Sequence, residues 1–164
     1  MVSEAGTSLR DALGQKMDEL SEALNGLDEE KARQRAADAE WCCKEVLSHL
    51  MGDEGADVLA PLRQIIEEDT PLIGIVTGLP YYTPDRQTMS LAEMRGAVSS
   101  RYRELAEFLG GLTDADLARK ARVPLFKETP IGEYATMAQF VGALDFHLTD
   151  HINQIRNARQ QVGT

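Results

Sequence analysis

The sequence has little positive charge. It contains 17 lysine and arginine residues against 27 aspartate and glutamate residues, which gives a formal net charge of −10. Proteins that bind the phosphate backbone of nucleic acids usually present a basic face. The two short basic clusters, at residues 31–35 and 119–122, are interpreted as solvated helix ends. We therefore expect no nucleic-acid partner.

Long hydrophobic runs are also missing. No stretch approaches the roughly 20 apolar residues that a membrane-spanning helix needs. Residues 1–14 contain neither an apolar run nor a cleavage-like signal. We expect a cytoplasmic protein with no membrane partner. Its 164 residues suit one domain, residues 1–164, that can bury a hydrophobic core.

Cysteine is scarce, and the two cysteines, Cys42 and Cys43, are adjacent. A bond between them would be a strained vicinal disulfide, and two neighbouring cysteines make no disulfide framework. We interpret them as reduced thiols, at least one of which packs as a small apolar residue. Cys42 lies two helical turns from His49, roughly 10 Å along the axis. That is too far to share a first coordination shell, although Cys42 could lie near a bound substrate.

Four segments of the chain repeat apolar residues at steps of three and four, the period of an amphipathic helix. They cover approximately residues 4–25, 39–69, 90–112 and 129–161. Four long amphipathic helices predict the all-α fold class and, within it, a four-helix bundle.

Local signals refine these helices. Pro61 should kink the second helix, and Gly52 should weaken it. Ser90 and Glu93 have the spacing of a capping box at the start of the third helix. Pro130 occupies a tolerated first position of the fourth helix. A short helical turn is expected at residues 113–116, followed by an extended or irregular stretch.

The stretch between the second and third helices, residues 70–89, has no helical period. A segment of this length can cover about 30 Å, which is enough to return along the bundle. A loop this long in a compact domain needs a reason, and a crossover between parallel neighbours is one. The sequence therefore predicts an up-down-down-up bundle with its crossover between helices 2 and 3.

The chain has only three histidines: His49, His147 and His151. His147 and His151 are four residues apart, so both imidazoles leave one face of a helix. His49 lies about ten residues into the second helix, roughly 15 Å from its start. The other two lie roughly 15 and 21 Å from the end of the oppositely directed fourth helix. The three histidines are therefore predicted at one level of the bundle.

Three imidazoles that converge inside a bundle would form an open metal site. Each histidine has leucine neighbours, and a metal would satisfy a ring nitrogen that is otherwise costly to bury. The alternative is that each histidine is a hydrogen-bonded core or surface residue, because an HxxxH pair alone is a weak pattern. Imidazole ligands suit transition metals better than magnesium or calcium. We expect a divalent transition metal, Zn2+ first and Ni2+ next.

A metal-bound imidazole usually donates its second N–H group to an oxygen. Glu45, Asp53 and Asp150 lie on suitable helix faces, but for each of them we favour a solvated surface position. Gln154 could hold a water molecule, but we favour packing in the bundle seam. Trp41 could be a wall of a substrate site, but we favour an anchor for the start of the second helix.

Two motifs resemble those of a known family. Residues 41–50, Trp-Cys-Cys-Lys-Glu-Val-Leu-Ser-His-Leu, look like the helix-2 signature of the DinB/YfiT-like superfamily. Residues 147–155, His-Leu-Thr-Asp-His-Ile-Asn-Gln-Ile, are similar to its closing motif. The resemblance implies a four-helix bundle of up-down-down-up topology, a divalent metal held by the three histidines near one end of the bundle, and frequent dimerisation.

Members of this superfamily with assigned activities are thiol-dependent transferases, isomerases or hydrolases. Our hypothesis is a metal-dependent enzyme that activates a thiol or a water against a small electrophilic substrate, of the thiol S-transferase or hydrolase type. Its partners would be a small-molecule substrate, a low-molecular-weight thiol among the candidates, and a second copy of the chain in a homodimer. No catalytic residue is assigned beyond the metal ligands. The alternative is a non-catalytic metal-binding or stress-response helical bundle.

Overall fold

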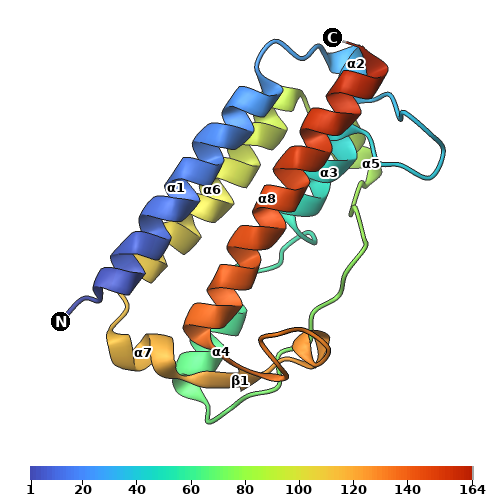
Figure 1. The fold of residues 1–164 in the computed structure, drawn as a ribbon. Helices are drawn as coiled ribbons and strands as arrows, with labels where there is room; N and C mark the ends of the chain where they lie inside the picture. Colours follow the sequence, from blue (N-terminus) through green and yellow to red (C-terminus); the bar gives the residue numbers. More distant parts are fainter. Residues whose placement is uncertain (164) are drawn as a thin grey trace.

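The structure is a computed structural model that describes residues 1–163. It is mostly helical, with one small sheet (Figure 1). In chain order its elements are α1 (Glu4–Leu24), α2 (Glu29–Ala32), α3 (Cys43–Met51), α4 (Ala60–Glu67), α5 (Pro84–Thr88), α6 (Leu91–Gly110), α7 (Asp114–Ala118), β1 (Lys120–Arg122), the 3-10 helix η1 (Pro124–Phe126), β2 (Tyr134–Thr136) and α8 (Met137–Val162).

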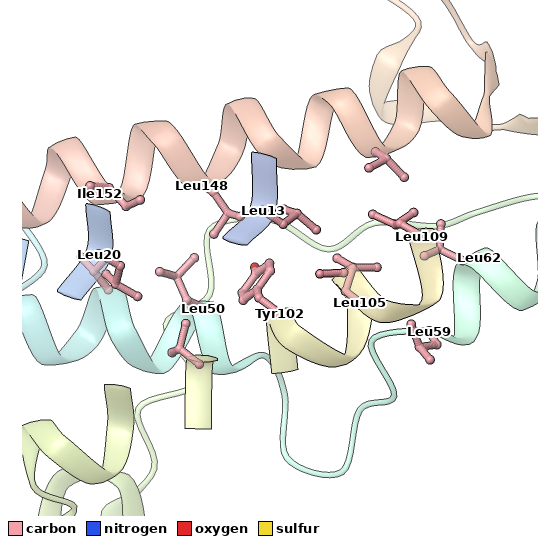
Figure 2. Packing of buried hydrophobic residues seen from close by; sticks show 14 of the residues in the cluster. Leu13, Leu20, Leu50, Leu59, Leu62, Tyr102, Leu105, Leu109, Leu148 and Ile152 are labelled. Carbon is pink, nitrogen blue, oxygen red and sulfur yellow. The ribbon is translucent and has the colours of Figure 1, made fainter. Parts of the chain in front are cut away.

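Four helices pack around the core. Helix α1 lies against α6 and α8, and α3 lies against the same two helices. Figure 1 shows α1 and α8 running in one direction and α3 and α6 running in the other. Figure 2 shows the buried side chains between them, with Leu148 and Ile152 projecting from α8 toward Leu13, Leu20 and Tyr102. This packing holds α3 beside α8, the two helices that carry the histidines.

Helices α1, α6 and α7 begin close to the residues expected from sequence. At the start of α6, Glu93 N donates to Ser90 Oγ over 3.1 Å and Ser90 N donates to Glu93 Oε2 over 2.7 Å. These two bonds are the predicted capping box. They satisfy backbone donors that have no partner inside the helix.

The prediction of one kinked second helix is wrong. The segment forms two helices, α3 and α4, and α3 starts at Cys43 rather than near residue 39. Gly52 ends α3 with φ +76° and ψ −179°, a conformation that is essentially restricted to glycine. Pro61 lies in the first turn of α4, where its missing N–H costs nothing, so it starts a helix instead of kinking one.

Replacing Gly52 with alanine is expected to lower the free energy of unfolding by about 1–3 kcal/mol, because a side chain disfavours this backbone conformation. The new Cβ would also approach Arg101 Nη2 to 2.8 Å, although that flexible side chain can move. Urea denaturation measures the change. Gly96→Ala, inside α6 with open space around its Cβ, is the matched control and should stabilise by about 0.5–1 kcal/mol. Equal effects of the two substitutions would contradict the prediction.

The predicted start of the fourth helix is also wrong. Helix α8 begins at Met137, where Thr136 caps it in a second capping box with Gln139. The preceding residues form β2, which pairs antiparallel with β1. Pro130 therefore lies in the loop before the sheet, and Tyr134 lies on a strand. The Thr136–Gln139 spacing is itself a capping signal in the sequence. The prediction placed the start of the helix at Pro130 instead.

The segment between α4 and α6 follows the outside of the bundle. Near its start Leu72 forms a parallel bridge with Arg122 of β1, and near its end the chain forms α5. Figure 1 shows the segment travelling from the α4 end of the molecule to the α5 end. On the way it passes α3, where its backbone contacts the histidine site described below.

Every helix formed by residues 1–163 is too short or too polar to cross a membrane.

Candidate metal centre

The three predicted histidines come together between α3 and α8. His49 lies in the last turn of α3, and His147 and His151 lie on successive turns of α8. Nε2 of His147 is 3.2 Å from Nε2 of His49 and 2.9 Å from Nε2 of His151. One ring nitrogen of each residue lies within 4.8 Å of the other two. All three rings therefore present a nitrogen to one small volume.

Hydrogen bonds on the far side of two rings decide which nitrogen carries the proton. Nδ1 of His49 lies 2.7 Å from the carbonyl oxygen of Leu79. Because a carbonyl only accepts, Nδ1 is the donor and Nε2 keeps a free lone pair. Nδ1 of His151 lies 2.8 Å from Oε1 of Gln154 and donates to it in the same way. Both rings thus aim an unprotonated Nε2 at the common volume.

This arrangement fits a bound cation. Two unprotonated nitrogens cannot hydrogen-bond to each other, and a proton on Nε2 of His147 can serve only one of its two neighbours at a time. A tetrahedral zinc ion with Zn–N distances of about 2.0–2.1 Å separates its nitrogen ligands by about 3.3 Å. The two distances from Nε2 of His147, 3.2 and 2.9 Å, are close to that value. A divalent transition ion would satisfy all three lone pairs at once, so the residues present are able to hold one.

Burial favours the neutral form of two of the rings, His147 and His151. Burial, followed by the neighbouring His151 and His49, lowers the pKa of His147 to about 4. Burial also lowers the pKa of His151. Neutral imidazoles have the free lone pairs that a metal requires, so protons do not compete for His147 or His151 at neutral pH.

Trp41 forms one side of the site. The centroid of its ring system lies 5.2 Å from that of His49 and 6.3 Å from that of His151, with an interplanar angle of 8° to the latter. It precedes α3 by two residues and is only half-buried. The indole therefore lies near the start of α3, where we expected an anchor, and also against two of the predicted ligands.

A groove of about 730 Å³ opens beside the histidines. Trp41, His151 and Gln154 belong to its wall, so a small molecule in the groove can contact His151, the one histidine in that wall. Most of the other side chains are polar, and none is a lysine or arginine. The lining residues are Ala39, Glu40, Trp41, Asp150, His151, Asn153, Gln154, Asn157, Ala158 and Gln161.

None of the acidic residues considered as hydrogen-bond partners of the rings binds a histidine within residues 1–163. Glu45 accepts from Arg35 Nε and from the backbone N of Cys42, both at 2.9 Å. Asp53 accepts from the backbone N of Glu54. Asp150 makes no hydrogen bond to a histidine within the described residues, although its charge acts to raise the pKa of His147 and His151.

The oxygens that hold the rings are instead those of Gln154 and Leu79. Gln154 was assigned to seam packing in our sequence analysis, and that preference is wrong, because its side chain binds His151. The carbonyl of Leu79 was missed altogether. A backbone oxygen has no sequence signature, and only the path of the segment past α3 brings it to His49.

Both cysteines are free and buried, as expected for reduced thiols packed in the core. Cys43 Sγ lies 3.6 Å from the carbonyl of Ile155, and burial raises the pKa of this thiol to about 11. Burial raises the pKa of Cys42 as well. Neither residue lines the groove. At neutral pH both are protonated, so neither supplies a thiolate nucleophile.

Comparison with known proteins agrees with this architecture. The sequence profile of the DinB superfamily matches residues 12–155 of the chain. The structure is similar to that of YfiT from Bacillus subtilis, described as a probable metal-dependent hydrolase with an unusual four-helix bundle topology. The TM-score is 0.75 at 18% sequence identity, over 96% of this chain and 88% of YfiT. At this identity the similarity concerns the fold alone. No curated protein sequence matches the chain significantly.

Proposed function

This chain belongs to the DinB superfamily, and on that basis we propose that it is a metal-dependent enzyme that activates a thiol or a water against a small electrophilic substrate. The reaction would be of the thiol S-transferase or hydrolase type. One observation carries the proposal: three imidazole nitrogens converge beside a groove that a small molecule can enter.

In the proposed site His49, His147 and His151 hold the metal, which we take to be zinc, with nickel next, since imidazole nitrogen suits both ions. Such an ion, when bound, lowers the pKa of a water or thiol at its open position, so that a nucleophile forms near neutral pH. The carbonyl of Leu79 and the amide of Gln154 keep two of the rings in the tautomer that exposes Nε2.

The groove gives a small molecule access to the site at His151. Its volume of about 730 Å³ suits a small molecule rather than a macromolecule. Trp41 offers an indole face next to His151, and the amides of Asn153 and Asn157 offer hydrogen-bond donors and acceptors. The description of YfiT as a probable metal-dependent hydrolase supports the hydrolytic form of the reaction.

Three further features belong to the proposal. An up-down-down-up topology, with the crossover in residues 70–89, is supported by the helix directions in Figure 1.

A homodimer is supported by exposed apolar side chains, such as Phe146 on α8 and Val76, which an interface would cover. Its test is the mass of the purified protein in solution. A cytoplasmic location without a nucleic-acid partner completes the proposal, and the net charge of −10 supports the lack of that partner.

Metal removal and reloading tests the function. Protein stripped with a chelator and then reloaded with zinc or nickel should hold one ion per chain by elemental analysis. It should catalyse thiol addition to, or hydrolysis of, a small electrophile, assayed with several cellular thiols and with water alone. Activity should disappear on stripping and return on reloading, since the nucleophile forms only at the metal.

Failure to bind stoichiometric metal would contradict the proposal. One tightly bound ion with no turnover in either assay would favour the non-catalytic metal-binding bundle instead.

A further inference from the structure

The orientation of His49 depends on a segment that is not part of the bundle. Its Nδ1 donates to the carbonyl of Leu79, in the stretch that links α4 to α6. The side chain of Leu79 is 46% exposed, so packing in the core does not hold this residue in place. Some other contact must keep its carbonyl against the ring.

That contact lies two residues further along the segment. The carbonyl of Tyr81 accepts a hydrogen bond from Ser48 Oγ at 2.9 Å and another from Arg86 Nη1 at 3.3 Å. Ser48 is fully buried and is the neighbour of His49 on α3. Tyr81 adopts φ +50°, a left-handed conformation that is unfavourable for a residue with a side chain. Such a conformation persists only where surrounding contacts enforce it.

Arg86 is the centre of these contacts. It belongs to α5, and only 6% of its surface is exposed. Besides the Tyr81 carbonyl, its Nη1 binds the carbonyl of Ser48 at 2.9 Å and Ser48 Oγ at 3.2 Å. Ser48 is in the last turn of α3, where carbonyls lack partners within the helix and the helix dipole favours a cation.

Arg86 is buried, but its guanidinium has no carboxylate partner within residues 1–163. Buried arginines are normally paired with carboxylates. Arg86 forms no salt bridge to a carboxylate anywhere in residues 1–163, and every acceptor of Nη1 belongs either to Ser48 or to the backbone of Tyr81. Its guanidinium therefore joins just two partners, the end of α3 and the segment that carries Leu79.

We propose that Arg86 is a positioning residue for the histidine site: by clamping Tyr81 to Ser48, it holds the Leu79 carbonyl against His49 and keeps Nε2 of that ring unprotonated. The consequence for metal affinity rests on the proposed function, whereas the consequence for the ring itself does not. Without the clamp the carbonyl is free to leave, and His49 can place its proton on Nε2, where it blocks coordination.

The test compares Arg86→Met with Gln87→Ala. Gln87, the next residue on α5, is exposed and binds the carbonyl of Tyr82 at 3.2 Å, so the control removes a neighbouring hydrogen bond to the same segment without touching Tyr81 or Ser48. Imidazole ¹⁵N spectra of the metal-free proteins report the His49 tautomer. We expect the Nδ1–H form in the wild type and in Gln87→Ala, and a mixture of forms in Arg86→Met. Zinc titration should show affinity about 10–100-fold weaker in Arg86→Met alone.

Ser48→Ala keeps the test decisive if Arg86→Met does not fold. It removes one of the two side-chain hydrogen bonds to the Tyr81 carbonyl, which also accepts from the backbone N of Thr83 at 3.0 Å. The change of volume is minimal, and the tautomer balance should shift in the same direction by a smaller amount. An unchanged His49 tautomer in folded Arg86→Met, or in Ser48→Ala where only that variant folds, would overturn the inference. If the wild type binds no zinc, the proposed function fails, but the tautomer spectra still decide the role of Arg86.

Discussion

The variant His147→Ala is expected to lose stoichiometric metal, with zinc affinity lowered by at least about 100-fold, more than the loss of an outer-shell partner typically causes. The reason is geometric. His147 is the ring that lies within 3.2 Å of His49 and 2.9 Å of His151, nitrogen to nitrogen, so it links the other two ligands. Two imidazoles remain after the substitution, which leaves an incomplete donor set for a three-nitrogen site. Competition with a chromophoric chelator measures the affinity, and elemental analysis measures the content.

Gln160→Ala is a suitable control for this experiment. Gln160 is exposed on the same helix, between three and four turns beyond His147, so it reports any general effect of altering α8. It should bind zinc as the wild type does. If His147→Ala retains one zinc ion per chain at wild-type affinity, the three histidines are not the metal site, and the proposed activity loses its basis.

The largest effect on stability is expected for Leu148→Ala. Leu148 is fully buried on α8, on the turn that also carries His147, and Figure 2 shows it directed into the core beside Leu13 and Tyr102. Removing three buried carbon atoms leaves a cavity that the surrounding helices fill only partly. We expect the free energy of unfolding to fall by about 2–5 kcal/mol. In a protein of this size that corresponds to a decrease in Tm of roughly 5–20 °C.

Urea denaturation of metal-free protein isolates this core effect from any contribution of metal binding. Leu125→Ala makes the same chemical change at a side chain that is 48% exposed, and it should cost less than about 0.5 kcal/mol. Similar losses in the two variants would mean that Leu148 does not support the core in the way the structure describes.

Several elements followed from local sequence signals. The apolar period and the Ser90–Glu93 capping box predicted the positions of α1 and α6, because these interactions lie within one or two helical turns. The histidine level was estimated from the rise per residue of a helix, and the rings do meet. The estimate placed the start of α3 four residues too early. The three histidines were still predicted at one level, because each residue changes the distance along the helix axis by only about 1.5 Å.

Other elements were misjudged because two local signals competed. Pro130 and Thr136 are both acceptable at the start of a helix, and pairing of residues 134–136 with β1 decided in favour of Thr136. Likewise Gly52 can weaken a helix or end it. The close approach of Arg101 and the direction of the following loop belong to the folded chain, not to the local sequence.

The amino-acid sequence by itself determined the helical class, most of the helix positions, and which three residues could serve as nitrogen ligands. Periodicity and capping are short-range properties that each segment carries alone. Only the tertiary structure decided how those ligands are held. The carbonyl of Leu79, the amide of Gln154 and the buried guanidinium of Arg86 act on residues of other turns or distant segments. The first is a backbone atom that every residue possesses, and the guanidinium binds backbone carbonyls. Their roles arise from proximity in space, which a pattern of residue types does not encode.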